Sequence, residues 1–422
     1  MVRRGALCLL LLVGCEYITG SFERNPFSGD PYPILIENHY GALVVGVNEA
    51  STNEEHTAVL DVMSPLTLID RGPTAEVNIK ATDLLIKGAR FPGGELDLPR
   101  ALLKEQPTAT LHPCATDPCE VGTGIDPRPF DALLGMDSFG GDALRLHLAT
   151  NEITILPDIA GSELHRSRSC DAVMPDPFRG GGTLVIGGTE VPFLNWRIAI
   201  DACISPNPDP LLVQSARGVD ALFVLSTAIG PSIINESTYE RIRLLDPVRD
   251  LMTPPLDTLP DHTLFLPSGP VTGKLTVMRG LALVGNSSSS PRAPCRQVYA
   301  SHFLADRNCS SLDTDCPCAS GTSLDHGCQV PAIVELDASA PISVLIVPDA
   351  EPTLQSLRAE LRPNRPEVDG ILGTEALLSF ELDLDYAHTR LLGRCVDPTI
   401  CSARPVLLNS EARAYVNGCT EK

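Results

Sequence analysis

The chain has 422 residues, 43% of them hydrophobic, and a formal net charge of -21 at pH 7. This length exceeds one ordinary domain and suits two lobes, and the hydrophobic fraction is enough for substantial cores. The acidic balance argues against a nucleic-acid-binding surface, which needs a basic footprint, and against direct adhesion to anionic lipid.

The N-terminus predicts export and lipid anchoring. A basic start, MVRR, is followed by an apolar run that is too short to span a bilayer and then by LVGC at residues 12–15. This tetrapeptide resembles the bacterial lipobox, in which the cysteine, here Cys15, is lipidated and becomes the first mature residue. The alternative is an ordinary cleaved signal peptide. We therefore expect a signal over residues 1–15, a tether over residues 16–33, and a lipid-anchored protein of the bacterial cell envelope, at the outer membrane or its periplasmic face.

The first predicted lobe, residues 34–160, contains two apolar segments and a hairpin. Residues 58–69 read AVLDVMSPLTLI, an apolar run that enters a tight turn, and residues 131–137 read DALLGMD. The stretch that follows alternates between apolar and polar positions in two runs, which predicts a hairpin of residues 143–148 and 152–156.

Two other regions connect these motifs and the lobes. Residues 81–94 can form a further hairpin, and no tyrosine lies near it. Residues 161–182 are the predicted linker. The glycines at 180–182 and 187–188 flank a short apolar strand, so we predict hairpin turns there and not a phosphate-binding loop.

The second predicted lobe, residues 183–400, repeats the motifs of the first. Residues 223–234 read FVLSTAIGPSII and residues 369–375 read DGILGTE. A second alternating pair of runs, residues 380–385 and 390–392, predicts another hairpin. An internal duplication of this kind fixes the architecture as two similar β lobes.

Few segments have helical periodicity, so we expect a mainly β fold. The best helical stretches are short and cover residues 236–245, after Asn235 as the N-cap, and residues 353–360. A cysteine-rich insertion at 286–330 decorates the second lobe and serves either as a binding loop or as a cover for a lobe edge. Residues 401–422 are a predicted C-terminal tail.

The paired order of these motifs resembles the pepsin-like and retropepsin-like aspartic proteases over roughly residues 35–160 and 180–395. In that superfamily each lobe contributes an Asp-Thr/Ser-Gly turn after an apolar strand, and a later apolar-apolar-Gly segment packs beneath the turn. The resemblance implies a bilobal pepsin-like fold of two related β-barrel-like lobes. The six positions of the two turns are occupied here by Asp61, Val62, Met63, Ser226, Thr227 and Ala228.

The two turns depart from the pattern that the chemistry needs. Catalysis in the family uses two carboxylates that share one proton, because two like charges about 3 Å apart cannot both ionise. Asp61 remains at the first position, but Ser226 stands where the second Asp belongs, and only Thr227 of the following residues matches the family. The glycine that lets each turn close tightly is also replaced, by Met63 and by Ala228.

We therefore predict a protein that has kept the fold and lost the peptidase activity. The favoured function is a monomeric, non-catalytic lipoprotein whose interlobe cleft binds an extended peptide or protein, as yet unidentified. The first alternative is an atypical aspartic endopeptidase that combines Asp61 with a displaced acid, Asp220 or Asp369, although Asp369 has a counterpart in Asp131 and is better explained as a turn cap. The second is a purely structural protein whose cleft is filled by its own side chains, with Val62 and Met63 projecting into the substrate space.

Cysteine usage favours an oxidising compartment. Of the 14 cysteines, Cys8 and Cys15 belong to the signal region, and the rest form an even set. Zinc binding by Cys316, Cys318, Cys328 and His326 is an alternative, but disulfides are favoured, so neither a metal nor a cofactor is predicted. Cys114 and Cys119 suit a local bridge. The full set of disulfide candidates is Cys114, Cys119, Cys170, Cys203, Cys295, Cys309, Cys316, Cys318, Cys328, Cys395, Cys401 and Cys419.

Overall fold

A computed structural model describes most of both predicted lobes. The described residues are 32–35, 37–39, 41–49, 52–64, 67–70, 79–87, 95–106, 132–139, 143–156, 172–175, 178–186, 189–206, 218–246, 253–266, 269–284, 294–295, 298, 330–336, 341–361, 367–386, 390–395 and 399–405. The predicted signal and lipobox, the Cys114 to Cys119 bridge, Asp131, and the zinc alternative at Cys316 all lie outside these residues. The predicted tether, residues 16–33, also lies outside them up to residue 31, but its last two residues belong to a strand, β1. Among the described residues, none of the helices has the length and apolar content needed to cross a membrane.

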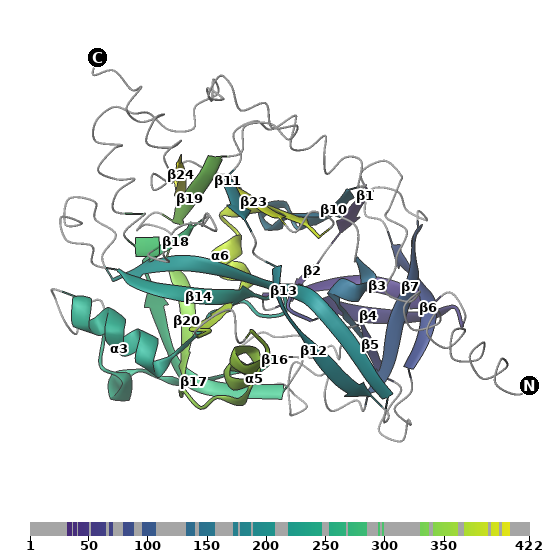
Figure 1. Ribbon diagram of the computed structural model, residues 1–422, viewed down its shortest axis with the longest axis horizontal. Helices are drawn as coiled ribbons and strands as arrows, with labels where there is room; N and C mark the ends of the chain where they lie inside the picture. The colour runs from purple at the N-terminus through teal and green to yellow at the C-terminus, as the bar shows by residue number, and fades with distance from the viewer. Residues whose placement is uncertain are drawn as a thin grey trace, which may run out of the picture.

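The first lobe is one mixed sheet, seen on the right of Figure 1. A central short strand, β8, runs parallel to β4 and antiparallel to β5, and β7 and β6 continue the sheet beyond β5. Strand β3 pairs with β2, β4 and β6. The bounds are β2 (Glu37–His39), β3 (Ala42–Glu49), β4 (Glu54–Leu60), β5 (Leu68–Asp70), β6 (Ile79–Lys87), β7 (Glu95–Gln106), β8 (Ala132–Leu134) and η2 (Met136–Ser138).

The second lobe repeats this arrangement on the left of Figure 1, with β21 parallel to β14 and antiparallel to β15. Strands β20, β17 and β16 continue the sheet beyond β15, and β13 links β14 to β12, β18, β19 and β24. The bounds are β12 (Phe178–Ile186), β13 (Thr189–Ser205), β14 (Val219–Leu225), β15 (Ser232–Asn235), η5 (Leu256–Thr258), β16 (Asp261–Leu266), β17 (Gly269–Met278), β18 (Gly280–Val284), β19 (Val330–Leu336), β20 (Ile342–Val347), β21 (Gly370–Leu372) and β24 (Cys401–Pro405).

The strand registers show that the two lobes are copies of one unit. In the first lobe, Leu60 pairs in parallel with Leu134, and in the second lobe Leu225 pairs in parallel with Leu372. The turn motifs keep a constant separation of 165 positions between the copies. The mainly β fold of two related lobes that was predicted from the sequence is therefore confirmed.

A third layer joins the lobes. Strands pair antiparallel in the order β1, β10, β9, β22, β23, β11, and this interlobe sheet crosses the top of the view in Figure 1. Strands β9 and β10 form the hairpin predicted for the first lobe, and β22 and β23 form the one predicted for the second. The bounds are β1 (Tyr32–Leu35), β9 (Ala143–His147), η3 (Leu148–Thr150), β10 (Glu152–Leu156), β11 (Ala172–Pro175), β22 (Phe380–Asp385) and β23 (Arg390–Cys395).

Three short helices complete the described fold. Helix α3 (Glu236–Leu245) begins at the predicted N-cap, where the Asn235 side chain accepts a hydrogen bond from the Thr238 N–H at 2.8 Å. Helix α5 (Pro352–Leu361) packs its apolar side against the second-lobe core through Leu354, Leu357 and Leu361. Helix α6 (Thr374–Leu377) follows β21.

Two expectations for the region between the lobes need correction. The predicted linker, residues 161–182, contains β11 and the first part of β12, so a portion of it is strand that pairs with β23 and β13. The glycines at 180–182 lie inside β12, at an irregularity in its register with β13, and do not form a turn. The other predicted turn, at residues 187–188, lies outside the described residues, between the paired Ile186 and Thr189.

Candidate functional site

The turns at residues 61–63 and 226–228 meet where the two lobes meet. Asp61 follows β4 and Ser226 follows β14, so each ends an apolar strand at the equivalent point of its lobe. Each is held by the strand beside it, because the Asp61 N–H donates to the Leu134 carbonyl at 3.1 Å and the Ser226 N–H donates to the Leu372 carbonyl at 3.0 Å. The duplicated fold therefore places these two side chains face to face.

Ser226 takes the place of the second carboxylate. Its Oγ donates to Oδ1 of Asp61 at 2.9 Å, and the same Oδ1 accepts from the Met63 N–H at 2.9 Å and the Thr227 N–H at 3.3 Å. Ser226 Oγ accepts from the Ala228 N–H at 3.2 Å, which matches the Met63 bond in the other turn. Asp61 is thus the only acid in this pair of turns.

Thr227 ties the two turns together. Its hydroxyl donates to the Leu60 carbonyl at 2.7 Å and accepts from the Val62 N–H at 3.1 Å, and all of these groups are buried. Val62 occupies the equivalent position in the first lobe and has no hydroxyl, so it cannot return the two bonds. The hydroxyl of the second-lobe turn therefore bonds to the first-lobe turn, but no hydroxyl at the equivalent position of the first-lobe turn bonds back to the second.

A second pair of hydroxyls supports the turns from behind. Thr67 Oγ1 accepts from the Gly135 N–H at 3.1 Å, and Ser232 Oγ accepts from the Gly373 N–H at 3.1 Å. Our reading of the sequence did not identify Thr67 or Ser232. The signal was available, because both residues lie six positions after the first residue of their motif in the two aligned copies.

Met63 and Ala228, which stand where the motif has glycine, each pack into the core of the opposite lobe. Met63 is the only first-lobe member of an apolar cluster that otherwise consists of second-lobe residues, including Leu222 and Val224. Conversely, Ala228 joins a cluster otherwise formed by the first lobe. Val62 is fully buried as well. The side chains that we expected to fill the substrate space are therefore packed into the molecule, one of them across the boundary between the lobes.

The backbones of the two lobes also approach very closely beside these turns. Gly41 has a φ of 86°, and a Cβ on it would lie 1.9 Å from the Cα of Gly230, so no side chain fits there. The Gly41 carbonyl accepts from Thr374 Oγ1 at 2.7 Å, and the Leu43 N–H donates to the Thr227 carbonyl at 2.9 Å. The contact thus consists of direct hydrogen bonds between the start of β3 and the second-lobe turns.

The environment of Asp61 favours its neutral form. Its side chain is 1% exposed, and burial raises its pKa, while its hydrogen bonds and the charge of Arg197 act in the opposite direction. Arg197 is itself paired with Glu360 at 2.9 Å. No described carboxylate is hydrogen bonded to Asp61, so the arrangement lacks the second acid that would split the pKa values.

A tyrosine does lie near Asp61, but it comes from the second lobe. Burial, and then the charge of Asp61, raise the pKa of Tyr386 well above its usual range, so its hydroxyl keeps its proton. That hydroxyl donates to the sulfur of Met136. Tyr386 follows β22 and does not belong to the β6–β7 hairpin, which is the predicted first-lobe hairpin without a tyrosine. We did not single out this residue from the sequence.

The two displaced acids that could rescue catalysis have other roles. Asp369 accepts from the Leu222 N–H at 2.9 Å, from Thr238 Oγ1 at 2.7 Å and from Arg241 at 2.6 Å. Its carboxylate therefore links the residue just before β21 to β14 and to α3, which agrees with the turn-cap interpretation.

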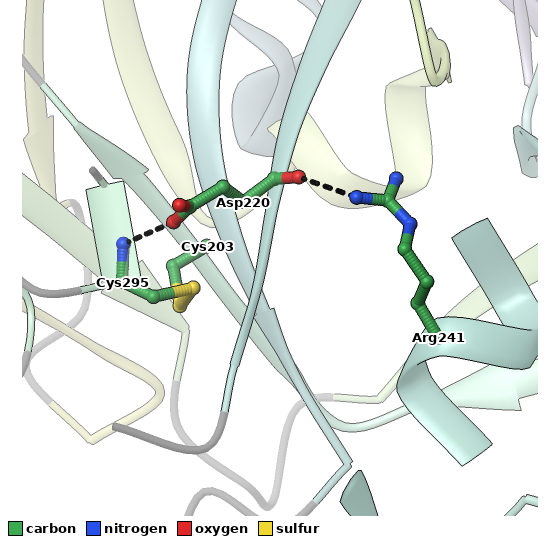
Figure 2. Close-up of a disulfide and its surroundings, with 4 residues drawn as sticks. All are labelled: Cys203, Asp220, Arg241 and Cys295. Atoms are coloured by element: carbon green, nitrogen blue, oxygen red, sulfur yellow. Dashed lines mark hydrogen bonds between the residues drawn. A yellow bond between two sulfur atoms is a disulfide. The ribbon is translucent and has the colours of Figure 1, made fainter. Parts of the chain in front are cut away.

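Asp220 is part of the support of a disulfide. Figure 2 shows its Oδ1 accepting from the Cys295 N–H, at 2.8 Å, beside the bridge between Cys203 and Cys295. Its carbonyl accepts from Arg241 at 3.5 Å. A second disulfide joins Cys395 to Cys401. Four of the candidate cysteines are thus paired in two bridges; the others, from Cys114 to Cys419, lie outside the described residues.

No family model and no curated protein sequence matches the chain. Among solved structures, basic 7S globulin from soybean is similar at 10% identity and a TM-score of 0.40, covering 86% of this chain and 94% of the globulin. An aspartic proteinase from Irpex lacteus is similar at 9% identity and a TM-score of 0.39, covering 86% of this chain and 97% of the proteinase. These values are too low to transfer the role of any residue.

Replacing Asp61 by Asn should stabilise the protein increasingly as the pH rises. At pH values well below the ordinary aspartate pKa of about 3.9, Asp61 is protonated in the folded and unfolded states alike, so the substitution has its smallest benefit. Above that, the unfolded chain ionises first, because the folded pKa is raised, and the wild type loses stability until the pH passes the folded pKa. The variant gains about 1.4 kcal/mol in free energy of unfolding, relative to the wild type, for each unit by which the folded pKa of Asp61 exceeds the unfolded pKa.

Urea denaturation from pH 3 to pH 8 measures this difference. Asp257→Asn, which removes an exposed carboxylate from η5, is the control for general loss of negative charge. A stability difference between Asp61→Asn and wild type that shrinks with rising pH would show that the three hydrogen bonds to Oδ1 outweigh burial.

Proposed function

We propose that this chain is a non-catalytic, pepsin-like lipoprotein of the bacterial cell envelope, anchored through Cys15, which binds an extended peptide or protein segment between its lobes. The observation that carries the non-catalytic part is the 2.9 Å hydrogen bond between Ser226 Oγ and Asp61. A hydroxyl at this position cannot share a proton with Asp61 as a carboxylate does, so no acid and base pair forms.

The binding part of the proposal rests on analogy with the way active members of the fold hold an extended substrate by strand addition. The anchoring part rests on the lipobox at residues 12–15, and the envelope location follows from it. A purely structural role is the second candidate. It is favoured by the burial of Met63 within a second-lobe cluster, because this side chain packs the two lobes together.

The atypical endopeptidase is the least supported of the three. It requires a second carboxylate beside that of Asp61. The two acids named for that role are hydrogen bonded elsewhere, Asp369 to Arg241 and Thr238 on α3, and Asp220 to the Cys295 N–H. Either acid would have to leave these bonds before it could serve Asp61.

Incubation of the mature chain, held in detergent micelles, with a diverse peptide library from pH 3 to pH 7 tests the proposal. We expect mass spectrometry to find no cleavage by the wild type or by Asp61→Ala, and some peptides to be retained by both. Cleavage that disappears in Asp61→Ala would overturn the non-catalytic conclusion. Neither cleavage nor retention would instead favour the structural role.

A further inference from the structure

The turn end of the β3–β4 hairpin carries a group of metal-ligating side chains, at the opposite end of β4 from Asp61. Glu49 closes β3, and Glu54 and His56 lie on β4. Glu49 pairs directly with Glu54 across the hairpin, and His56 is two positions further along the same strand, so all three side chains project from one face. One ligand atom from each residue lies within 4.8 Å of the others.

The three side chains differ in how firmly they are held. Glu49 is 1% exposed and His56 is 3% exposed, whereas Glu54 lies at the surface. Thr52 Oγ1 donates to the Glu49 carboxylate at 3.2 Å and accepts from the Glu54 N–H at 3.2 Å. Asn53, in the left-handed conformation at φ 57°, and its N–H bond of 2.7 Å to the Glu49 carbonyl fix the turn. The hairpin thus supplies two buried ligands, Glu49 and His56, and one ligand at the surface, Glu54, whose side chain can change its orientation.

We propose that Glu49, Glu54 and His56 bind one divalent transition-metal ion of the zinc class. Imidazole nitrogen together with carboxylate oxygen is a donor set that suits such ions, whereas the hard cations Ca²⁺ and Mg²⁺ take oxygen ligands. Ligand distances of about 2.0–2.2 Å require the three donors to lie about 3.4 Å apart, so donors that now lie within 4.8 Å of one another must draw together slightly when the ion binds. The exposed Glu54 side chain can rotate for this purpose.

Three protein ligands leave a tetrahedral ion with one open position, which water or a donor from a ligand fills. The ion would also join β3 to β4 beside their turn and neutralise two carboxylates that lie close together. It does not involve Asp61 or Ser226, so this inference does not depend on the proposed function. The sequence signal is a Glu followed, after four residues, by Glu-x-His, on either side of the connection between β3 and β4.

Titration of the full mature chain with Zn²⁺ alone, by isothermal calorimetry after removal of metals with a chelator, tests the proposal. We expect binding of one ion by the wild type, weakened by at least about tenfold in Glu54→Gln and in His56→Ala. Glu55→Gln is the matched control, since Glu55 is exposed on the same strand and points to the other face. It should bind like the wild type.

Glu54→Gln keeps the test decisive if His56→Ala does not fold, because Glu54 is exposed and its loss leaves the buried groups intact. A rise in Tm with Zn²⁺ that is lost in Glu54→Gln would support the site by a second measurement. Equal Zn²⁺ affinity in the wild type and Glu54→Gln would place the ion elsewhere, for example on the cysteine-rich insertion, and overturn the proposal. Absence of Zn²⁺ binding by the wild type, or Ca²⁺ binding tighter than Zn²⁺ binding, would also overturn it.

Discussion

Replacing Thr227 by Val should destabilise the folded protein by about 2–6 kcal/mol. Valine has nearly the same shape but no hydroxyl, so the Leu60 carbonyl and the Val62 N–H both remain buried and lose their partner. Each unsatisfied buried group costs about 1–3 kcal/mol, because it has also lost its hydrogen bonds to water. Urea denaturation, followed by circular dichroism, measures the change in the free energy of unfolding.

Thr227→Ser is the matched control for this prediction. It keeps the hydroxyl and removes only a methyl group, so most of the stability should return. If Thr227→Val unfolds at the same urea concentration as the wild type, the hydroxyl contributes little and packing alone holds the lobes together. Equal losses in the Ser and Val variants would assign the effect to the methyl group.

Replacing Arg145 by Met should cost about 3 kcal/mol of folding stability at pH 7. Arg145 on β9 makes two hydrogen bonds to Asp383 on β22, at 2.7 and 2.9 Å, and also pairs with Glu381 at 3.2 Å. Both acids are almost completely buried. Removing the arginine therefore leaves two carboxylates out of water without their main counter-charge, which is far more costly than losing an exposed pair.

Two further variants separate these effects, again by urea denaturation. Lys274→Met breaks another pair between neighbouring antiparallel strands, in which Asp261 is 78% exposed, and should change stability by less than about 1 kcal/mol. Adding Asp383→Leu to Arg145→Met should recover part of the loss, because one buried charge goes with its partner. An Arg145→Met variant no less stable than Lys274→Met would mean that water reaches the interlobe acids.

Local sequence patterns were sufficient to predict much of the fold. Alternation with period two placed both hairpins of the interlobe sheet, and the order of an apolar strand, a turn and an apolar-apolar-Gly segment identified the duplication. These signals are carried by neighbours in the chain. The sequence did not reveal that part of the linker is strand, because β11 is short and is defined by its pairing with β23, more than two hundred positions away.

The candidate site was predicted only in part for the same physical reason. Asp61, Ser226 and Thr227 could be named because they stand at motif positions. The exchange of Met63 and Ala228 between lobes, and the approach of Tyr386 to Asp61, depend on how distant segments pack, and no local pattern encodes that. His56 went unnoticed because its two partners converge only when the hairpin closes in its observed register.

The interlobe contact also bears on how this chain relates to a symmetric dimer. In such a dimer, a residue on the two-fold axis always meets its own copy. Arg145 and Asp383 are equivalent positions of the two repeats, and they pair with each other in the register of β9 and β22. Identical copies would place two arginines or two aspartates there, and the like charges would repel. Joining the repeats in one chain let the two positions acquire opposite charges, and the same freedom let Ser226 face Asp61. These two contacts favour the pairing of unlike halves over the pairing of two like halves.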